Sequence, residues 1–578
     1  MVFSPKCTYF VKVIQYSQMA GRKKTYPHVQ PIEEWAILKI SQNRKEIVQE
    51  VTRRSIRKVS EDTEEAKMTI EDQVAKTMYM EAIRMREEPW NIDPSDEKSF
   101  WKSIKKRLIR NERKEEEGKN LELVNMELLR EIVERYAEEI AGFFHVPTFK
   151  FARTVLPILF SRLLNAISAT GMARFFNPTK HIEDKLHITG EIAAIRALAQ
   201  KGTVILVPTH SSNLDSILIG WAIEHIGLPP FIYGAGLNLF NNRIVGAFMN
   251  RLGAYKVDRR KKNIVYNETL KTFSTVAIQS GCHSLFFPGG TRSRSGALEN
   301  KLKLGLLGTA MEAQRQNFVE NSEHPNGKIF VVPLVLCYHF VFEAESLIKQ
   351  HLHSAGQDKF YIEDEYSSNW KILKFVWNFF AKSSEMELSF GRPMDVMGNF
   401  VDNEGISYDQ QGRVINTVDY FKSRGKINED RQRDSEYTRM LGNKIADRFK
   451  AENVVFSSHI VAFAGFELLR RDYKELDLYS LLRLPQDDRG VQQNEMLLAI
   501  ERIISRLRDM QTQRQVRLAE HLETNAAQIL LHGIQHLGLY NDKRPLMMGD
   551  DGKVHSQSLS LLHFYYNRLT GYGLEKFV

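Results

Sequence analysis

Between about residues 190 and 395, short runs of β-branched and aromatic residues alternate with longer helical stretches, and this alternation constrains the fold most. The runs include GTVILVP at 202–208, PPFIYGA at 229–235 and KIFVVPLVLC at 328–337. Strands that alternate with helices need crossover connections, which produce a largely parallel sheet covered by helices. The sequence therefore predicts an α/β core with a mixed, largely parallel sheet.

The segments on either side of this core have the pattern of amphipathic helices. Glu, Lys and Arg are interleaved with single apolar residues from about 30 to 140, and helical periodicity returns beyond about 400. At 578 residues, the chain is long enough for several domains. We expect an N-terminal helical domain at 1–140, an α/β domain at 141–400 and a C-terminal helical domain at 401–578.

The loop after the strand at 202–208 carries the residues best suited to catalysis. It reads THSSNLD and leads into an apolar helix, so His210 precedes a helix and Asp215 lies in its first turn. We predict that Asp215 binds one imidazole nitrogen and leaves the other to accept a proton from a hydroxyl group. Amides at the helix start are expected to hold a developing oxyanion.

The chain contains a second His-x4-Asp pair, His353 and Asp358. This pair follows a helical stretch, and no strand brings its histidine to the edge of a sheet. With 17 histidines in the chain, such a spacing also arises by chance. We therefore expect these two residues to lie on the surface without a catalytic role.

A glycine-rich basic loop follows another predicted strand, in HSLFFPGGTRSRSG. Glycines allow backbone amides to approach an anion, and the guanidinium groups of Arg292 and Arg294 match phosphate oxygens in bidentate fashion. Arg259 ends a shorter strand in GAYKVDR and adds another cation. Together these residues predict a phosphate site, although a solvated basic turn remains the alternative for the glycine-rich loop alone.

Four blocks in order, HSSNLD, GAYKVDR, FPGGTRSR and VVPLV, resemble the glycerol-phosphate acyltransferases. This family belongs to a group that also acylates lysophosphatidate and dihydroxyacetone phosphate, and the resemblance covers roughly residues 140 to 480. It implies that His210 is the base and that Asp215 orients it. The substrate-binding residues that it implies are Arg259, Arg292 and Arg294 at the acceptor phosphate, Gly290, Thr291 and Ser293 in the same loop, and Pro333 on the acyl side.

Two positions depart from the family pattern. Gly289 stands where the family usually has a glutamate, so an acceptor contact is expected to be missing, although a Gly-Gly turn here is similar to that of the plastid soluble branch. The second block reads Val-Asp-Arg, which is closer to the lysophosphatidate enzymes. The first departure indicates a variant of the active site, and the second leaves the identity of the acceptor substrate undecided.

The resemblance implies transfer of a fatty acyl group from acyl-CoA or acyl-ACP to glycerol 3-phosphate, the first step of phospholipid synthesis, without a metal or organic cofactor. The alternatives are an acyltransferase for lysophosphatidate or dihydroxyacetone phosphate, a thioesterase, and a non-catalytic lipid- or anion-binding scaffold. Motifs of serine hydrolases, P-loop NTPases, zincins and dinucleotide-binding enzymes are absent from the sequence.

The net charge of +9 favours an anionic partner, for which we expect lipid and phosphorylated substrates rather than nucleic acid. No run of eighteen apolar residues occurs, so we expect no transmembrane helix. The stretch NWKILKFVWNFFAKSS at 369–384 has the pattern of an interfacial helix, or of a helix packed on the sheet with snorkelling lysines. These features predict a peripheral protein at the cytoplasmic face of a membrane.

Overall fold

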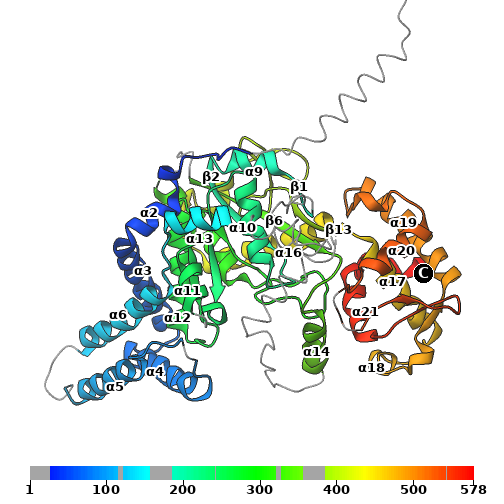
Figure 1. The fold of residues 1–578 in the computed structure, drawn as a ribbon. Coiled ribbons are helices and arrows are strands. Elements are labelled where there is room, and N and C mark those ends of the chain that lie inside the picture. The colour runs from blue at the N-terminus through cyan, green and yellow to red at the C-terminus, as the bar shows by residue number, and fades with distance from the viewer. Residues whose placement is uncertain are drawn as a thin grey trace, which may run out of the picture.

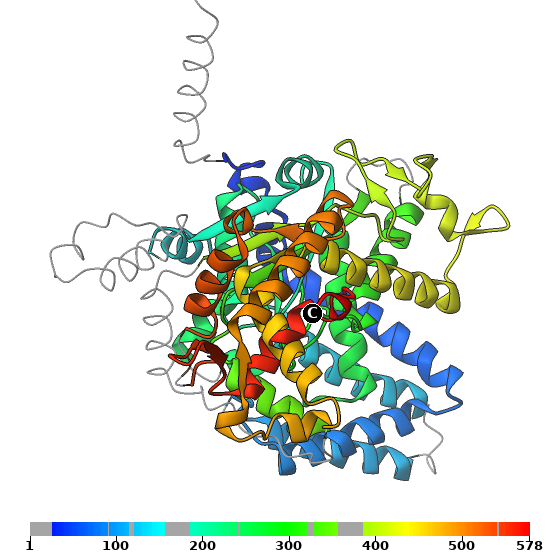
Figure 2. The same cartoon turned by 90° about the vertical axis from the view of Figure 1, so that its right-hand side faces the viewer.

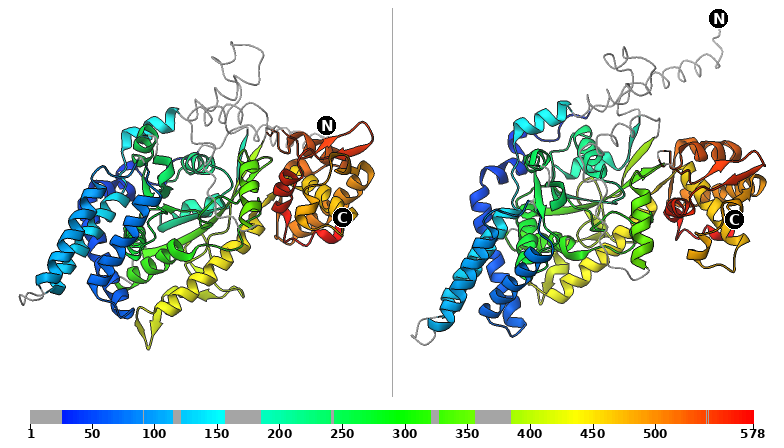
Figure 3. Two further views of the ribbon diagram at one scale, coloured as in Figure 1. Left: turned by 90° about the horizontal axis from the view of Figure 1, so that it is seen from below. Right: turned by 60° about the horizontal axis from the view of Figure 1, so that its bottom comes forward.

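A seven-stranded sheet forms the centre of the chain, and helical regions lie at its two ends (Figure 1). This computed structural model describes residues 26–90, 92–114, 121–155, 185–240, 243–320, 327–355, 385–539, 541 and 543–578. Figure 3 shows the N-terminal helices in blue and the C-terminal helices in orange and red on opposite sides of this sheet.

The strand order in the central sheet is β1-β7-β6-β2-β5-β3-β4. The strands are β1 (Leu186–Gly190), β2 (Gly202–Pro208), β3 (Ile232–Gly236), β4 (Ala254–Val257), β5 (Ser284–Leu285), β6 (Lys328–Tyr338) and β7 (Met386–Phe390). Five strands, β6, β2, β5, β3 and β4, run parallel, whereas β7 is antiparallel to β6 and parallel to β1. The prediction of a mixed, largely parallel sheet is therefore confirmed.

Helices cover both faces of the sheet, which explains why β2 is apolar along its whole length. Val204 and Leu206 of β2 belong to one apolar cluster and Ile205 and Val207 to another, because successive side chains point to opposite faces. The crossover helices between parallel strands are α10 (Asp215–His225), α11 (Arg243–Asn250), α12 (Ile264–Gln279) and α13 (Leu304–Glu320), with the 3-10 helix η4 (Leu237–Phe240). Two further helices, α9 (Ile192–Leu198) and α14 (Ala344–Ala355), lie between strands of opposite direction.

The N-terminal helices pack on α12 at the β4 end of the sheet. They are η1 (Ile32–Glu34), α2 (Ala36–Gln42), α3 (Arg44–Glu65), α4 (Ile70–Glu87), α5 (Glu97–Lys114) and α6 (Leu121–Ile140). Val51 of α3 and Tyr136 of α6 share one buried cluster with Tyr266 and Phe273 of α12. This packing joins the helical region to the α/β core through a continuous apolar contact.

The C-terminal region contains α17, a helix that is buried over almost its entire length. In Figure 2, the orange and red helices of this region face the viewer. Its helices are α16 (Arg431–Glu452), α17 (Ser457–Asp472), α18 (Leu478–Leu481), α19 (Gln493–Thr512), α20 (Ala526–His536) and α21 (Leu559–Tyr566). Its 3-10 helices are η6 (Thr417–Phe421), η7 (Gln486–Asp488), η8 (Glu520–Leu522), η9 (Asn567–Leu569) and η10 (Glu575–Phe577). The sequence pattern indicated helices here but not the short strands that accompany them.

Short strands connect the helices of this region. They are β8 (Phe400–Val401), β9 (Ser407–Tyr408), β10 (Val414–Ile415), β11 (Lys422–Ser423), β12 (Lys426–Ile427), β13 (Val454–Val455), β14 (Gly490–Gln492), β15 (Arg517–Leu518), β16 (Met547–Met548) and β17 (Lys553–His555). Most are only two residues long, which is too short for the two-residue alternation of a strand to be visible in sequence.

None of the helices among the described residues is long and apolar enough to cross a bilayer. The predicted interfacial helix at 369–384 lies outside the described residues, as does Asp358 of the second His-x4-Asp pair. Its histidine, His353, is exposed on α14, in agreement with the expected surface position.

Candidate active site

Three of the four sequence blocks meet at one edge of the sheet. The first block follows β2, the second contains β4 and ends in the loop after it, and the third follows β5, whereas the fourth lies within β6. Because these strands are parallel, their carboxyl ends face the same edge, where open α/β sheets bind their ligands. The topology therefore brings residues from widely separated parts of the chain to one place.

His210 and Asp215 form the hydrogen-bonded pair that the sequence predicted. The Nδ1 atom of His210 lies 2.8 Å from Oδ2 of Asp215, and Asp215 is completely buried as the first residue of α10. An ionised carboxylate can only accept, so Nδ1 carries the proton and Nε2 keeps its lone pair. This arrangement gives His210 the tautomer that a general base requires.

The environment of Asp215 holds its carboxylate in place. The backbone amides of Ser211 and Ser212 donate to Oδ2 at 2.7 and 2.9 Å, and the hydroxyl of Tyr338 donates to Oδ1 at 2.5 Å. Burial and the nearby Asp215 carboxylate raise the pKa of Tyr338 well above its ordinary value, so this hydroxyl stays protonated and remains a donor. The position of α10 helps further, since a helix N-terminus favours negative charge.

The amides at the start of α10 differ from the sequence-based expectation. Ser211 and Ser212 donate to Asp215, and the amide of Asn213 donates to Oε1 of Glu343 at 3.0 Å. These N–H groups are thus engaged by carboxylates of the site itself. The expectation that they hold the oxyanion is wrong for this arrangement, because each would first have to leave a charge-assisted hydrogen bond.

The third block is attached directly to the catalytic loop. The amide of Ser293 donates to the carbonyl oxygen of His210 at 2.7 Å, and the ring of Phe287 stacks on the imidazole with centroids 4.0 Å apart. Glu299, a few residues farther on, accepts a hydrogen bond from the backbone amide of His210 at 2.9 Å. The backbone and the ring of His210 are therefore both fixed by the loop that carries the arginines.

Glu299 also occupies the space next to Gly289. A Cβ atom at position 289 would lie 3.0 Å from Cγ and 3.2 Å from Oε1 of Glu299. Glu299 therefore fills the space next to the position where the family glutamate would begin, and the expected loss of an acceptor contact stays a prediction. Burial raises the pKa of Glu299.

Arg292 lies beside the catalytic loop through a shared carboxylate. Its Nη1 is 3.3 Å from Oε1 of Glu343, and Oε2 of the same carboxylate accepts from the hydroxyl of Ser212 at 3.0 Å. Glu343, which follows β6, is almost completely buried. The prediction that Arg292 and the catalytic loop share one site is supported by these contacts, whereas its role toward phosphate stays a prediction.

The Gly-Gly turn brings a lysine that the sequence analysis did not identify. Gly290 has a φ of +75°, a region that favours glycine, and a Cβ there would lie 2.6 Å from Cδ of Lys303. Thr291 follows in a partly buried position, and Arg294 is exposed to solvent near His351 of α14. Cationic side chains therefore lie on both sides of this turn.

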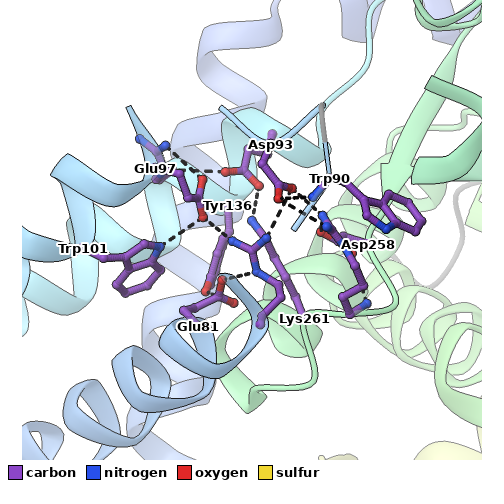
Figure 4. A network of polar contacts seen from close by, with 12 residues as sticks. Glu81, Trp90, Asp93, Glu97, Trp101, Tyr136, Asp258 and Lys261 are labelled. Atoms are coloured by element: carbon purple, nitrogen blue, oxygen red, sulfur yellow. Dashed lines mark hydrogen bonds and ion pairs between the residues drawn. The ribbon is translucent and has the colours of Figure 1, made fainter. Parts of the chain in front are cut away.

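The basic residues at the end of the second block and directly after it lie in two different environments. Arg259 is exposed, whereas the neighbouring Arg260 and Lys261 are buried against the N-terminal helices (Figure 4). Arg260 Nη2 lies 2.5 Å from Asp93 and 2.7 Å from Asp258, and Lys261 is paired with Glu139. The predicted role of Arg259 toward phosphate stays a prediction.

Pro333 lies inside the sheet. It pairs with Val207 in the β2–β6 register, and its carbonyl accepts a hydrogen bond from the amide of Gly391 at 2.8 Å. A proline on the central strand β6 removes one backbone donor. Its predicted role on the acyl side stays a prediction.

Three residues that complete the site were missed in the sequence. Tyr338, Glu343 and Glu299 contact the catalytic loop but belong to no recognised spacing. Tyr338 had a usable signal, because the alternation along β6 places it on the same face as Leu334 and Leu336 at the carboxyl end of the strand. The two glutamates lie in loops, where no periodicity marks them.

Comparison with known proteins agrees with the resemblance that the four sequence blocks indicated. Residues 190–337 match the family model described as Acyltransferase. A glycerol-3-phosphate acyltransferase of Pseudomonas fluorescens (strain Pf0-1) is 25% identical over 358 residues, which are 62% of this chain and 35% of that protein. Proteins of the same name from Pseudomonas paraeruginosa (strain DSM 24068 / PA7) and Pseudoalteromonas atlantica are 24% identical over 291 residues and 26% identical over 272 residues.

These similarities cover part of each protein. The match to the Pseudomonas paraeruginosa protein covers 50% of this chain and 30% of that protein. The match to the Pseudoalteromonas atlantica protein covers 47% of this chain and 29% of that protein. The chain thus spans about a third of the length of the curated relatives that it matches. The resemblance drawn from the four sequence blocks is confirmed for the segment that contains them.

Proposed function

We propose, from the acyltransferase domain formed by residues 190–337, that this chain transfers a fatty acyl group from a thioester to the hydroxyl of glycerol 3-phosphate. The observation that carries the proposal is the His210–Asp215 pair at 2.8 Å, attached to the loop that holds Arg292. A base and a guanidinium group at one sheet edge suit an acceptor that carries both a hydroxyl and a phosphate.

In the proposed reaction, Nε2 of His210 takes the proton of the acceptor hydroxyl while the hydroxyl oxygen attacks the thioester carbonyl carbon. The carbon–sulfur bond then breaks, and the leaving thiolate takes the proton from the imidazolium. Asp215 stabilises the imidazolium between these two steps, and a positioned base of this kind contributes about 10² to 10⁴ in rate. The products are an acylated glycerol phosphate and a carrier thiol.

The phosphate of the acceptor is proposed to bind between the third and second blocks. Arg292 and Arg294 approach from the loop after β5, Lys303 from the far side of the Gly-Gly turn, and Arg259 from the loop after β4. Guanidinium groups offer planar pairs of donors to phosphate oxygens, and the lysine adds a point charge. Gly290 lets the backbone approach the anion, with Thr291 and Ser293 beside it.

Purified chain, offered an acyl thioester and one acceptor at a time, tests the proposal. We expect release of carrier thiol that depends on glycerol 3-phosphate and disappears in His210→Ala, while the exposed-histidine control His353→Ala keeps it. Equal release without any acceptor would identify a thioesterase, and no release with any acceptor would identify a binding scaffold. Faster turnover with lysophosphatidate or dihydroxyacetone phosphate would instead identify that molecule as the acceptor.

The acyl donor and the place of action are also proposals. Acyl-CoA and acyl-ACP both present a thioester, so the same assay is run with each carrier. The net charge of +9 supports peripheral binding to an anionic membrane at its cytoplasmic face. Sedimentation with phosphatidylglycerol vesicles is expected to exceed that with phosphatidylcholine vesicles, and equal sedimentation would remove the electrostatic argument.

A further inference from the structure

Four histidines meet where the end of β6 contacts the C-terminal helices. His339 directly follows β6, His521 lies in η8, and His532 and His536 are one turn apart on α20. Ring centroids are 4.5 Å apart for His521 and His532, 4.3 Å for His532 and His536, and 5.0 Å for His339 and His536. These imidazoles form a single cluster, which we call the histidine cluster.

The nitrogen atoms of the histidine cluster are incompletely satisfied. Nδ1 of His339 contacts the hydroxyl of Ser458 at 3.0 Å, but its Nε2 is buried and has no partner among the described residues. Nδ1 of His536 is likewise buried without a partner in the described part of the chain. An unsatisfied buried polar atom costs about 1–3 kcal/mol, so two of them in one cluster call for a common partner.

The geometry of the cluster matches the needs of one metal ion. One ligand nitrogen from each of His339, His521 and His532 lies within 4.8 Å of the other two. Small ring rotations bring such atoms to bonds of about 2.0–2.1 Å around a single Zn²⁺. The contact of His532 Nδ1 with Ser457 Oγ at 2.7 Å leaves Nε2 for the ion and orients the ring, as a supporting hydrogen bond does in metal sites.

We propose that His339, His521 and His532 bind one divalent transition-metal ion, with Zn²⁺ as the best match for imidazole nitrogens and the neighbouring His536 as the candidate for a fourth ligand. His521 is the least prepared ligand, because its Nε2 accepts a hydrogen bond from the amide of Ser457 at 3.1 Å and must exchange that bond. The sequence analysis predicted no metal. Of these four histidines only His532 and His536 stand at a ligand spacing, and His339 lies about two hundred residues before them.

The place of the cluster gives the ion a structural role. His339 is the residue after Tyr338, whose hydroxyl holds Asp215, and the other three histidines belong to the C-terminal region. A bound ion would thus fasten α20 and η8 to the strand that supports the catalytic pair. This proposal rests on the cluster alone and does not depend on the reaction proposed above.

Metal content of the full chain, purified and freed of any histidine tag, tests the site. After dialysis against Zn²⁺ and then against metal-free buffer, we expect about one ion per chain by elemental analysis. His532→Gln, at a partly exposed position, is expected to lose the ion, whereas His353→Gln on the surface of α14 keeps it. Retention of the ion by His532→Gln, or no ion in the unchanged chain, would overturn the proposal.

A second measurement does not depend on a variant that folds. Co²⁺ loaded into the unchanged chain is expected to give the visible absorption of a tetrahedral nitrogen-ligated ion, and Zn²⁺ is expected to displace it. The thermal midpoint should also rise with Zn²⁺ and fall with a chelator, because an ion that binds only the folded chain stabilises it. An octahedral Co²⁺ spectrum together with an unchanged midpoint would show loose surface binding and contradict the proposal.

Discussion

The loop before α10 and the loop after β4 both bury charged side chains, but they leave different groups available. At the first loop, Asp215 is satisfied by four donors, and His210 still keeps one nitrogen for a substrate. At the second loop, Arg260 is bound by Asp93, Asp258 and the carbonyl of Glu88. Buried charges thus orient the candidate base His210 at the first loop, whereas at the second loop they join the N-terminal helices to the core.

The second network extends into the N-terminal helices (Figure 4). Arg84 contacts Glu81 at 2.6 Å and Glu97 at 2.5 Å, and it lies 3.3 Å from Asp93. Burial alone would lower the pKa of Arg84, but these carboxylates together raise it above its ordinary value. The network therefore consists of buried charged groups of opposite sign that are paired with one another across the interface.

From the comparison of these two loops, we expect the largest effect, a fall in kcat, for Asp215→Asn. The amide would donate where the carboxylate accepts, so His210 would hold the wrong tautomer, and we expect kcat to fall by about 10² to 10⁴. Steady-state thiol release gives kcat, and a thermal melt of the same sample checks the fold. A kcat close to that of the unchanged chain in a folded variant would remove Asp215 from its orienting role.

For Arg84→Ala we expect a loss of unfolding free energy rather than a loss of kcat. Removal of Arg84 takes the guanidinium group from two buried carboxylates, Glu81 and Glu97, and this costs about 3–5 kcal/mol of unfolding free energy. Tyr136 and Asn263 still donate to Glu81, and Trp101 and Arg135 still donate to Glu97. Urea titration measures this loss, and the folded fraction should keep its kcat because Arg84 does not contact the site. Arg86→Ala is the matched control, since this side chain lies on the same helix but is 75% exposed. Equal stability of the two variants would contradict the proposed role of the network.

The space beside Gly289 allows a test of how the catalytic loop is completed. A glutamate at 289 would meet Glu299 within 3.2 Å and place two carboxylates together, so we expect Gly289→Glu to lose about 1–3 kcal/mol of stability and much of its activity. Adding Glu299→Ala should restore part of both, because the second carboxylate is then removed. Additive losses in the double variant would show that the two positions do not share one space.

The sequence predicted the neighbourhood of His210, Asp215 and Arg292 better than the residues around them. The blocks that contain these three residues follow parallel strands, which deliver their loops to one edge. Glu343 and Glu299 were not predicted, since they contact the loop before α10 from 130 and 89 residues away without any recurring spacing. The burial of Arg260 beside Arg259 was not predicted either, because it depends on helices that pack from the N-terminal region.

The smallest effect is expected for Arg294→Lys, which asks whether an exposed cation of the third block contacts the acceptor. A lysine keeps the charge but loses the planar pair of donors, so the acceptor KM should rise about 3- to 10-fold with little change in kcat. Arg413→Lys, an exposed arginine on the C-terminal side of the core, is the control and should keep the KM. An unchanged KM in both variants would assign Arg294 to the solvated surface, as Arg260 is assigned to the buried interface, and would leave Arg292 and Lys303 as the phosphate contacts of this loop.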